Sequence, residues 1–115
     1  YLGDFGADVV KGEAINDGDD TRRWPPFRGN DGMVSLGANR NKRSIALDLK
    51  SAQGREIAHR LTSRADIAVE SFGPGVAKRL GIDYASVGVD NPRLIYCSIS
   101  GFGRAGRFAK ARVTT

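Results

Sequence analysis

The sequence predicts an α/β domain with a parallel sheet, because short apolar runs with strand character alternate with amphipathic helical segments. Strands are expected at residues 44–49, 67–70 and 94–98, with a helix between the first two. Turn-forming Gly, Pro, Asn and Asp residues separate these elements, and no internal repeat is visible. A chain of 115 residues is long enough for one domain with its own core.

The first residues predict the end of a helix followed by a strand. Residues 1–5 followed by Gly6 have the pattern of a last helical turn closed by a glycine in the left-handed conformation. Residues 7–11 (ADVVK) form a β-branched run suited to a buried strand.

Residues 13–43 are rich in Gly, Asp, Asn, Pro and Arg, which predicts one long loop. Long connections of this kind are either functional or disordered, and a solvated loop with two packing aromatics is an equal alternative. Trp24 and Phe27, on either side of two prolines, are expected to anchor the loop by burying aromatic area.

The middle of the chain predicts a strand, a helix and a second strand. Residues 44–49 place Ile45, Leu47 and Leu49 on one face. Ser51 can cap the following helix, whose apolar stripe is Ile57, Ala58, Leu61 and Ala65. Residues 67–70 (IAVE) form the second strand, and the crossover is right-handed if the two strands are parallel neighbours.

The second half continues the alternation. A glycine-rich loop at 71–75 (SFGPG) precedes a short helix at 76–80, and Asp83 is expected to cap another helix that runs through Asp90. Asn91 and Pro92 should stop that helix before the strand at 94–98 (LIYCS).

Composition and charge favour a soluble globular protein. Apolar runs are too short for a membrane span, and no secretion signal can be read in a chain that begins with Tyr1. The single cysteine, Cys97, allows no internal disulfide and favours a reducing, cytoplasmic location. The net charge of +5 comes mostly from the last residues, where Arg104, Arg107, Lys110 and Arg112 are accompanied by no acid. A basic tail on a near-neutral body gives only weak support for a nucleic-acid-binding alternative.

Two basic stretches lie where strands and loops meet. In the loop 71–75, Gly73 and Gly75 would allow close approach of the backbone to an anion, and Lys78 and Arg79 add charge within the next turn. A second basic stretch, NRNKR at 39–43, precedes a strand. Taken alone, each stretch is better explained as a plain turn or loop with solvated basic side chains.

Lone residues have structural interpretations. His59 is expected on the outer, solvated face of the helix, Cys97 is expected to be a small core residue, and Tyr96 is expected to pack. One His and one Cys do not suffice for a metal cluster.

Taken in order, seven segments resemble the N-terminal part of the class III coenzyme A transferases, the formyl-CoA transferase and succinate–glutarate type family. The similarity covers residues 2–103. The segments are GADVVKGE, GDDTRRWPPF, NRNKRSIALDLKS, GREIAHRL, ADIAVESFGPG, RLGIDY and NPRLIYCSISGFG.

The resemblance implies a Rossmann-like region at 1–103, a partial N-terminal portion of the family fold, followed by an atypical basic tail at 104–115. It also implies transfer of coenzyme A (CoA) from an acyl-CoA thioester to a carboxylate, through attack by an aspartate. By position, Leu47, Lys50, Phe72, Arg79 and Leu80 match family residues that contact CoA. Lys50 and Arg79 would pair with phosphates, while Phe72 and Leu80 would pack against the adenine or the pantetheine arm.

The sequence also departs from the family pattern. Ser71 stands where the family has Asn, and Ala14 stands where it has Arg or Pro. No residue matches the nucleophilic aspartate, which is expected beyond the chain end, so this chain alone is expected to be inactive. A non-catalytic CoA- or nucleotide-binding fragment and an acyl-CoA racemase of the same family remain alternatives.

The resemblance finally implies the partners. Acyl-CoA and carboxylates are expected as substrates, with no tightly bound cofactor, metal, nucleic acid or membrane. Full-length relatives are interlocked homodimers. Unmatched apolar surface in a partial chain predicts poor solubility or self-association.

Overall fold

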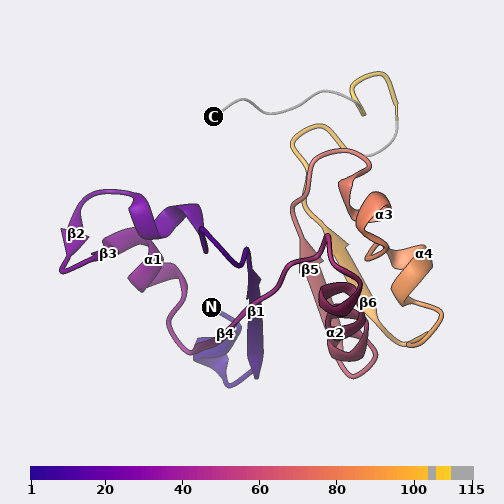
Figure 1. Ribbon diagram of the computed structural model, residues 1–115, viewed down its shortest axis with the longest axis horizontal. Coiled ribbons are helices and arrows are strands. Elements are labelled where there is room, and N and C mark those ends of the chain that lie inside the picture. Colours follow the sequence, from indigo (N-terminus) through magenta and orange to yellow (C-terminus); the bar gives the residue numbers. More distant parts are fainter. Residues whose placement is uncertain (104–105, 110–115) are drawn as a thin grey trace. The chain divides into compact units, whose positions relative to one another are not determined.

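The computed structural model describes residues 1–103 and 106–109, and it divides the chain into two compact units, 1–48 and 49–115 (Figure 1). Both units contain parallel strands and helices, so the predicted α/β class is confirmed. Within the described ranges, no helix is both long and apolar enough to cross a membrane.

The first unit is organised by a parallel pair of strands. Strand β1 (Val9–Glu13) pairs with β4 (Lys42–Ala46), with Val9 opposite Lys42 and Glu13 opposite Ala46. The predicted helical turn is present as a 3₁₀ turn, η1 (Gly3–Phe5), which Gly6 closes with φ of 94°. Both strands lie two or three residues from their expected positions, and β1 is half-exposed rather than buried, with Val10 38% exposed.

The predicted long loop is wrong in part, because the segment between β1 and β4 contains regular structure. The 3₁₀ turn η2 (Asp20–Arg23) begins at Asp19, whose carboxylate accepts hydrogen bonds from the backbone and hydroxyl of Thr21. The antiparallel strands β2 (Phe27–Arg28) and β3 (Asp31–Gly32) follow, and then helix α1 (Met33–Ala38).

Backbone contact rather than aromatic burial anchors this segment. Gly32 packs so tightly that a Cβ there would lie 2.3 Å from the carbonyl oxygen of Thr21 and 2.6 Å from that of Trp24. Trp24 and Phe27 are 51% and 54% exposed, so the expected aromatic anchor is not observed.

The second unit contains the other parallel pair. Strands β5 (Ile67–Glu70) and β6 (Ile95–Ser98) run side by side, with Ile67 opposite Ile95 and Val69 opposite Cys97 (Figure 1). β4 pairs with β1 inside the first unit, and β5 pairs with β6 inside the second. The right-handed crossover that would follow if residues 44–49 and 67–70 were parallel neighbours stays a prediction.

Three helices complete the second unit. Helix α2 (Ala52–Thr62) begins as predicted at Ser51, whose hydroxyl oxygen accepts from the backbone N–H of Gly54 at 3.0 Å. Helix α3 (Val76–Leu80) has the predicted bounds, whereas α4 (Tyr84–Val87) ends three residues before the predicted end.

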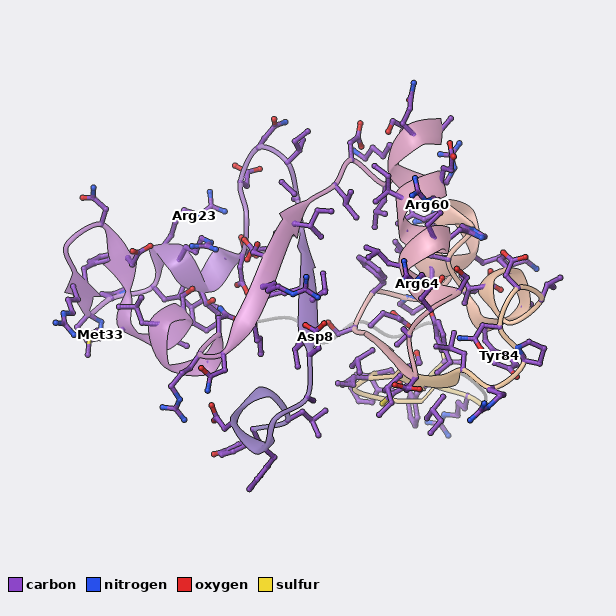
Figure 2. The ribbon with its side chains drawn as sticks, turned by 90° about the horizontal axis from the view of Figure 1, so that it is seen from below. Asp8, Arg23, Met33, Arg60, Arg64 and Tyr84 are labelled. Atoms are coloured by element: carbon purple, nitrogen blue, oxygen red, sulfur yellow. The ribbon has the colours of Figure 1, made fainter. Side chains whose placement is uncertain are left out.

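The core of the second unit is small. Its buried apolar side chains are Ala77 of α3, Val87 of α4 and Leu94, the residue before β6. Beside this core, Tyr84 (Figure 2) packs edge-on against Tyr96 with ring centroids 6.1 Å apart, which agrees with the prediction that Tyr96 packs.

One face of the β5–β6 pair is apolar and exposed. Ile67, Val69 and Ile95 are 47%, 57% and 63% exposed, and Cys97 is exposed beside them. Cys97 is therefore not the small core residue that its place in a strand suggested, since alternate strand residues face opposite sides and its side chain lies on the uncovered one. Self-association through such surface stays a prediction.

Candidate functional site

The five residues expected to contact CoA are divided between the two units. Leu47 lies in the first unit, directly after β4, where its N–H donates to the carbonyl oxygen of Glu13 at 2.9 Å. The other four lie in the second unit: Lys50 just before the N-cap of α2, Phe72 in the loop after β5, and Arg79 and Leu80 on α3.

The loop after β5 is held by the last residue of that strand. The Glu70 carboxylate accepts from the N–H of Phe72 at 2.8 Å and from the hydroxyl of Ser98 at 2.5 Å. Because β5 and β6 are parallel, these contacts join the carboxyl ends of both strands. The Phe72 N–H is thus engaged by a carboxylate, while the residue as a whole remains 37% exposed.

The glycine at the start of α3 brings the Arg79 side chain back over the loop. Gly75 has φ of 75°, and a Cβ placed on it would lie 3.5 Å from Nη1 of Arg79. Gly75 is the N-cap residue and stands between Pro74 and the first helical residue, Val76. The cation of Arg79 therefore lies close to the backbone of the glycine-rich loop.

Two side chains of α2 hold the backbone of the segments that carry the candidate residues. The guanidinium of Arg55 donates from Nη1 to the carbonyl of Lys50 at 2.7 Å, with the carbonyl of Leu49 at 3.5 Å. His59 lies one turn further along, with Nε2 2.7 Å from the carbonyl oxygen of Gly81, the residue after α3.

The prediction that His59 is solvated is wrong. Its side chain is 31% exposed and faces Gly81 and Asp90, whereas Ile57 and Leu61 of the expected apolar stripe are each 37% exposed. The inward face of α2 includes the buried Gly54 and the half-buried Arg55, Ala58, His59 and Thr62. Arg55 and His59 were not among the candidate residues, although their spacing of four residues places them on one helix face.

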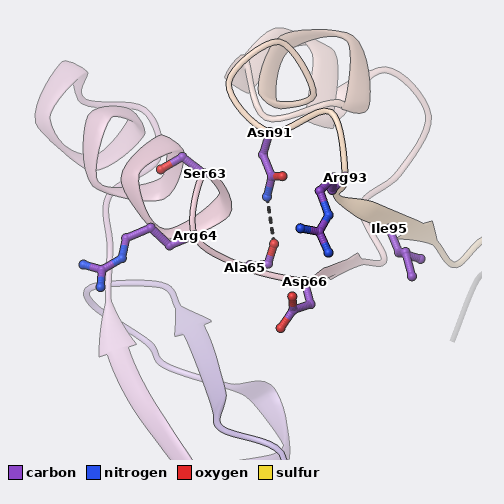
Figure 3. A pocket seen from close by; sticks show the side chains of 7 residues that line it. All are labelled: Ser63, Arg64, Ala65, Asp66, Asn91, Arg93 and Ile95. Atoms are coloured by element: carbon purple, nitrogen blue, oxygen red, sulfur yellow. Dashed lines mark hydrogen bonds between the residues drawn. The ribbon is translucent and has the colours of Figure 1, made fainter.

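A hollow in the second unit lies away from the candidate residues. It has a volume of about 290 Å³ at the amino ends of β5 and β6, and Asn91 spans one side of it by donating to the carbonyl of Ala65 (Figure 3). Its lining residues are Ser63, Arg64, Ala65, Asp66, Asn91, Arg93 and Ile95. None of the five candidate residues lines it, and ligands of parallel sheets bind at the opposite, carboxyl ends of the strands.

Comparison with known proteins defines the class. The model of CoA-transferase family III matches residues 1–113, and the chain belongs to this family. The resemblance inferred from the seven segments is therefore confirmed, as is a partial class III fold.

Curated relatives share more than two fifths of the matched residues. A succinate–glutarate CoA-transferase of Agrobacterium fabrum is 46% identical over 94% of this chain and 29% of its own length. The human succinyl-CoA:glutarate CoA-transferase is 43% identical over 91% of this chain and 24% of its own length. The chain thus spans about a quarter to three tenths of the length of these relatives.

A solved structure has the same fold. The crystal structure of a CAIB/BAIF family protein from Brucella suis superposes with a TM-score of 0.87 and 43% sequence identity. The match covers 96% of this chain and 30% of that one.

Proposed function

We propose that this chain forms the N-terminal, CoA-binding part of an acyl-CoA:carboxylate CoA-transferase. The observation that carries the proposal is the arrangement after β5, where Phe72 is exposed and Arg79 extends over the glycine-rich loop. Family membership indicates CoA as the ligand of this arrangement, because the relatives are named as CoA-transferases.

The roles of the site residues follow from their chemistry. Arg79 and Lys50 supply positive charge for the phosphates of CoA, and Phe72 and Leu80 supply apolar surface for the adenine or the pantetheine arm. Leu47 is included only because its position matches a CoA-contacting residue of the family. Because Glu70 engages the Phe72 N–H, cationic side chains rather than that backbone group bind the phosphates in this proposal.

The finer features of the proposal come from the sequence. Residues 1–103 form the Rossmann-like part and 104–115 a basic tail, most of which lies outside the described residues. Succinate and glutarate, named in two relatives, are the first carboxylates to try as acceptors. The cytoplasmic location, the interlocked homodimer and the choice between transferase and racemase remain predictions.

Replacing Arg79 with alanine is expected to weaken CoA binding about tenfold, since one charge-assisted hydrogen bond to a phosphate is lost from a partly screened site. Isothermal titration of the chain with CoA measures the change. Arg64→Ala is the matched control, because it removes the same charge from the opposite end of β5. Equal weakening by both variants, or no CoA binding by the wild-type chain, would contradict the proposal.

Catalysis is tested separately from binding. The chain alone is expected to show no transfer from succinyl-CoA to glutarate, because no residue in it matches the nucleophilic aspartate. Chromatographic detection of glutaryl-CoA measures this reaction. Turnover would show that the nucleophile is within the chain, whereas CoA binding without turnover is the expected result.

A further inference from the structure

Helix α2 contacts both segments of the second unit that carry candidate CoA residues. Arg55 and His59 lie one turn apart on this helix, and each directs a nitrogen atom at a backbone carbonyl of a different segment. Arg55 contacts the carbonyl of Lys50, and His59 contacts the carbonyl that follows Leu80. The two segments are 30 residues apart in the sequence, and the same helix face reaches both.

The direction of the second hydrogen bond is fixed by its partner. A carbonyl oxygen only accepts, so Nε2 of His59 carries the proton and donates it to Gly81. The other ring nitrogen, Nδ1, lies 3.5 Å from the carboxylate of Asp90 on the far side of the ring. The ring is therefore oriented between α3 and the segment after α4.

The turn after α3 is held from both sides. Gly81 has φ of 67°, and its N–H donates to the carbonyls of Ala77 and Lys78, which closes the helix. The next carbonyl, that of Ile82, accepts from the hydroxyl of Tyr96 in β6 at 2.9 Å. Arg55 also passes this turn, with its Cδ 3.9 Å from the place of a Cβ on Gly81. The carboxyl end of α3 is thus tied to α2 by His59 and to β6 by Tyr96.

We infer that Arg55 and His59 are positioning residues for CoA binding, Arg55 acting through Lys50 and His59 acting through Arg79 and Leu80. This inference rests on the proposed function. Neither residue needs to touch CoA. Each fixes the backbone from which a CoA-binding side chain extends, and α2 sets the spacing between the two.

Substitution of either residue is expected to weaken CoA binding about three- to tenfold, as for the loss of one hydrogen bond that orders a binding segment. The variants are Arg55→Met and His59→Leu, which keep much of the side-chain volume and remove the donors. Arg60→Met is the matched control, because Arg60 is an exposed cation of the same helix (Figure 2). Circular dichroism selects conditions in which every variant is folded.

Double-mutant cycles separate positioning from general destabilisation. His59→Leu should lose most of its effect on CoA affinity when Arg79 is already alanine, and Arg55→Met when Lys50 is already alanine. The crossed pairs, His59→Leu with Lys50→Ala and Arg55→Met with Arg79→Ala, should be nearly additive. A general loss of folding would couple to both partners alike.

Conservative variants test whether the lost hydrogen-bond donor, rather than unfolding, causes the loss of affinity. Gln at position 59 and Lys at position 55 each keep an N–H donor, so His59→Gln and Arg55→Lys should recover part of the affinity. If wild-type chain binds CoA and Arg79→Ala weakens it, but all four cycles are additive, the positioning roles are refuted while the proposed function stands. If wild-type chain binds no CoA, the proposed function fails and the inference falls with it.

Discussion

Replacing Glu13 with alanine is expected to lower the free energy of unfolding of the first unit by about 2 kcal/mol, because hydrogen bonds to a charged buried group are lost. The Glu13 side chain is only 6% exposed at the end of β1. Its Oε2 accepts from the backbone N–H of Asp19 at 3.1 Å and from Nε of Arg22 at 3.0 Å. Its Oε1 accepts from Nη2 of Arg22 at 3.0 Å and from the Ser44 hydroxyl at 3.1 Å.

This carboxylate joins three parts of the unit. It connects β1 to the 3₁₀ turn η2 through Asp19 and Arg22, and to β4 through Ser44. The backbone carbonyl of Glu13 also accepts a hydrogen bond from the N–H of Leu47. The Arg22 side chain is 41% exposed, so solvent screens the ion pair, and the expected loss comes mainly from the orphaned polar groups.

Urea unfolding monitored by the fluorescence of Trp24, the only tryptophan of the chain, reports on this unit. Asp8→Ala is the matched control. It removes a carboxylate that pairs with Arg43 at the surface, where the two side chains are 73% and 69% exposed, and should change stability by less than about 0.5 kcal/mol. If both substitutions lowered the free energy of unfolding equally, the hydrogen bonds of Glu13 would contribute no more to stability than a surface ion pair.

The same residue makes stability depend on pH. The hydrogen bond from Arg22 holds the pKa of the Glu13 carboxyl below its ordinary value of 4.5, although burial acts in the opposite direction. A lowered folded-state pKa stabilises the protein above the ordinary pKa, and this contribution is lost as the pH falls from 4.5 through the folded-state pKa. The Glu13→Gln variant should therefore lose less stability than wild type on acidification. Part of the pH dependence of stability should remain in this variant, because the hydrogen bond from Arg40 also lowers the pKa of Asp4.

Local rules were enough to predict several elements of the fold. The bounds of β5 and α3, the cap at Ser51 and the turn at Gly6 follow from runs of a few residues. The predicted strands at 7–11 and 44–49 differ by two or three residues from β1 and β4. The bounds of these strands depend on the pairing of residues 9–13 with 42–46, a long-range contact that local rules do not contain. The short helix α1 contains Gly and Ser and lacks a side-chain cap, so its pattern was weak.

The candidate CoA residues stay predictions from the family motifs, whereas the side chains that hold their backbone were not predicted. Phe72 and Arg79 follow from position in the family motifs. The contacts of Arg55 and His59 could not be predicted in this way. Their partners are backbone carbonyls, which every residue has, so no residue type marks them in the sequence. The apolar stripe of α2 was expected to face inward. The inward face instead carries the small residues Gly54 and Ala58, which let neighbouring segments approach the helix closely. The long polar side chains beside them, Arg55 and His59, reach the backbone carbonyls of those segments.

Replacing Asn91 should destabilise the second unit, because this side chain closes the carboxyl end of α2. Its Nδ2 donates to the carbonyl of Thr62 at 3.0 Å. It also donates to the carbonyl of Ala65 at 2.8 Å, the hydrogen bond drawn in Figure 3. Asn91→Ala leaves the carbonyl of Ala65 without this donor, while the carbonyl of Thr62, the last residue of α2, keeps the 3.3 Å hydrogen bond from the backbone N–H of Ala65. The expected loss is about 2 kcal/mol, from two hydrogen bonds of about 1 kcal/mol each.

Asn91→Asp tests the donor rather than the shape. Aspartate has the same size but brings carboxylate oxygens against two carbonyl oxygens, so at neutral pH it should be less stable than Asn91→Ala by about 1 kcal/mol. Hydrogen bonding to the carbonyls favours the protonated acid, which raises the pKa of the new side chain. The stability that protonation restores should therefore grow as the pH falls, opposite in sign to the contribution of Glu13.

Urea unfolding monitored by circular dichroism of the helices measures these differences, with Gln53→Ala as control because it removes an exposed carboxamide from α2. The outcome also tests the charge of the hollow beneath Asn91. Arg93 lines the same hollow and could turn the new carboxylate toward itself. Asn91→Asp would then be no less stable than Asn91→Ala and would show no gain on acidification, which would contradict the argument that the two carbonyls require a donor.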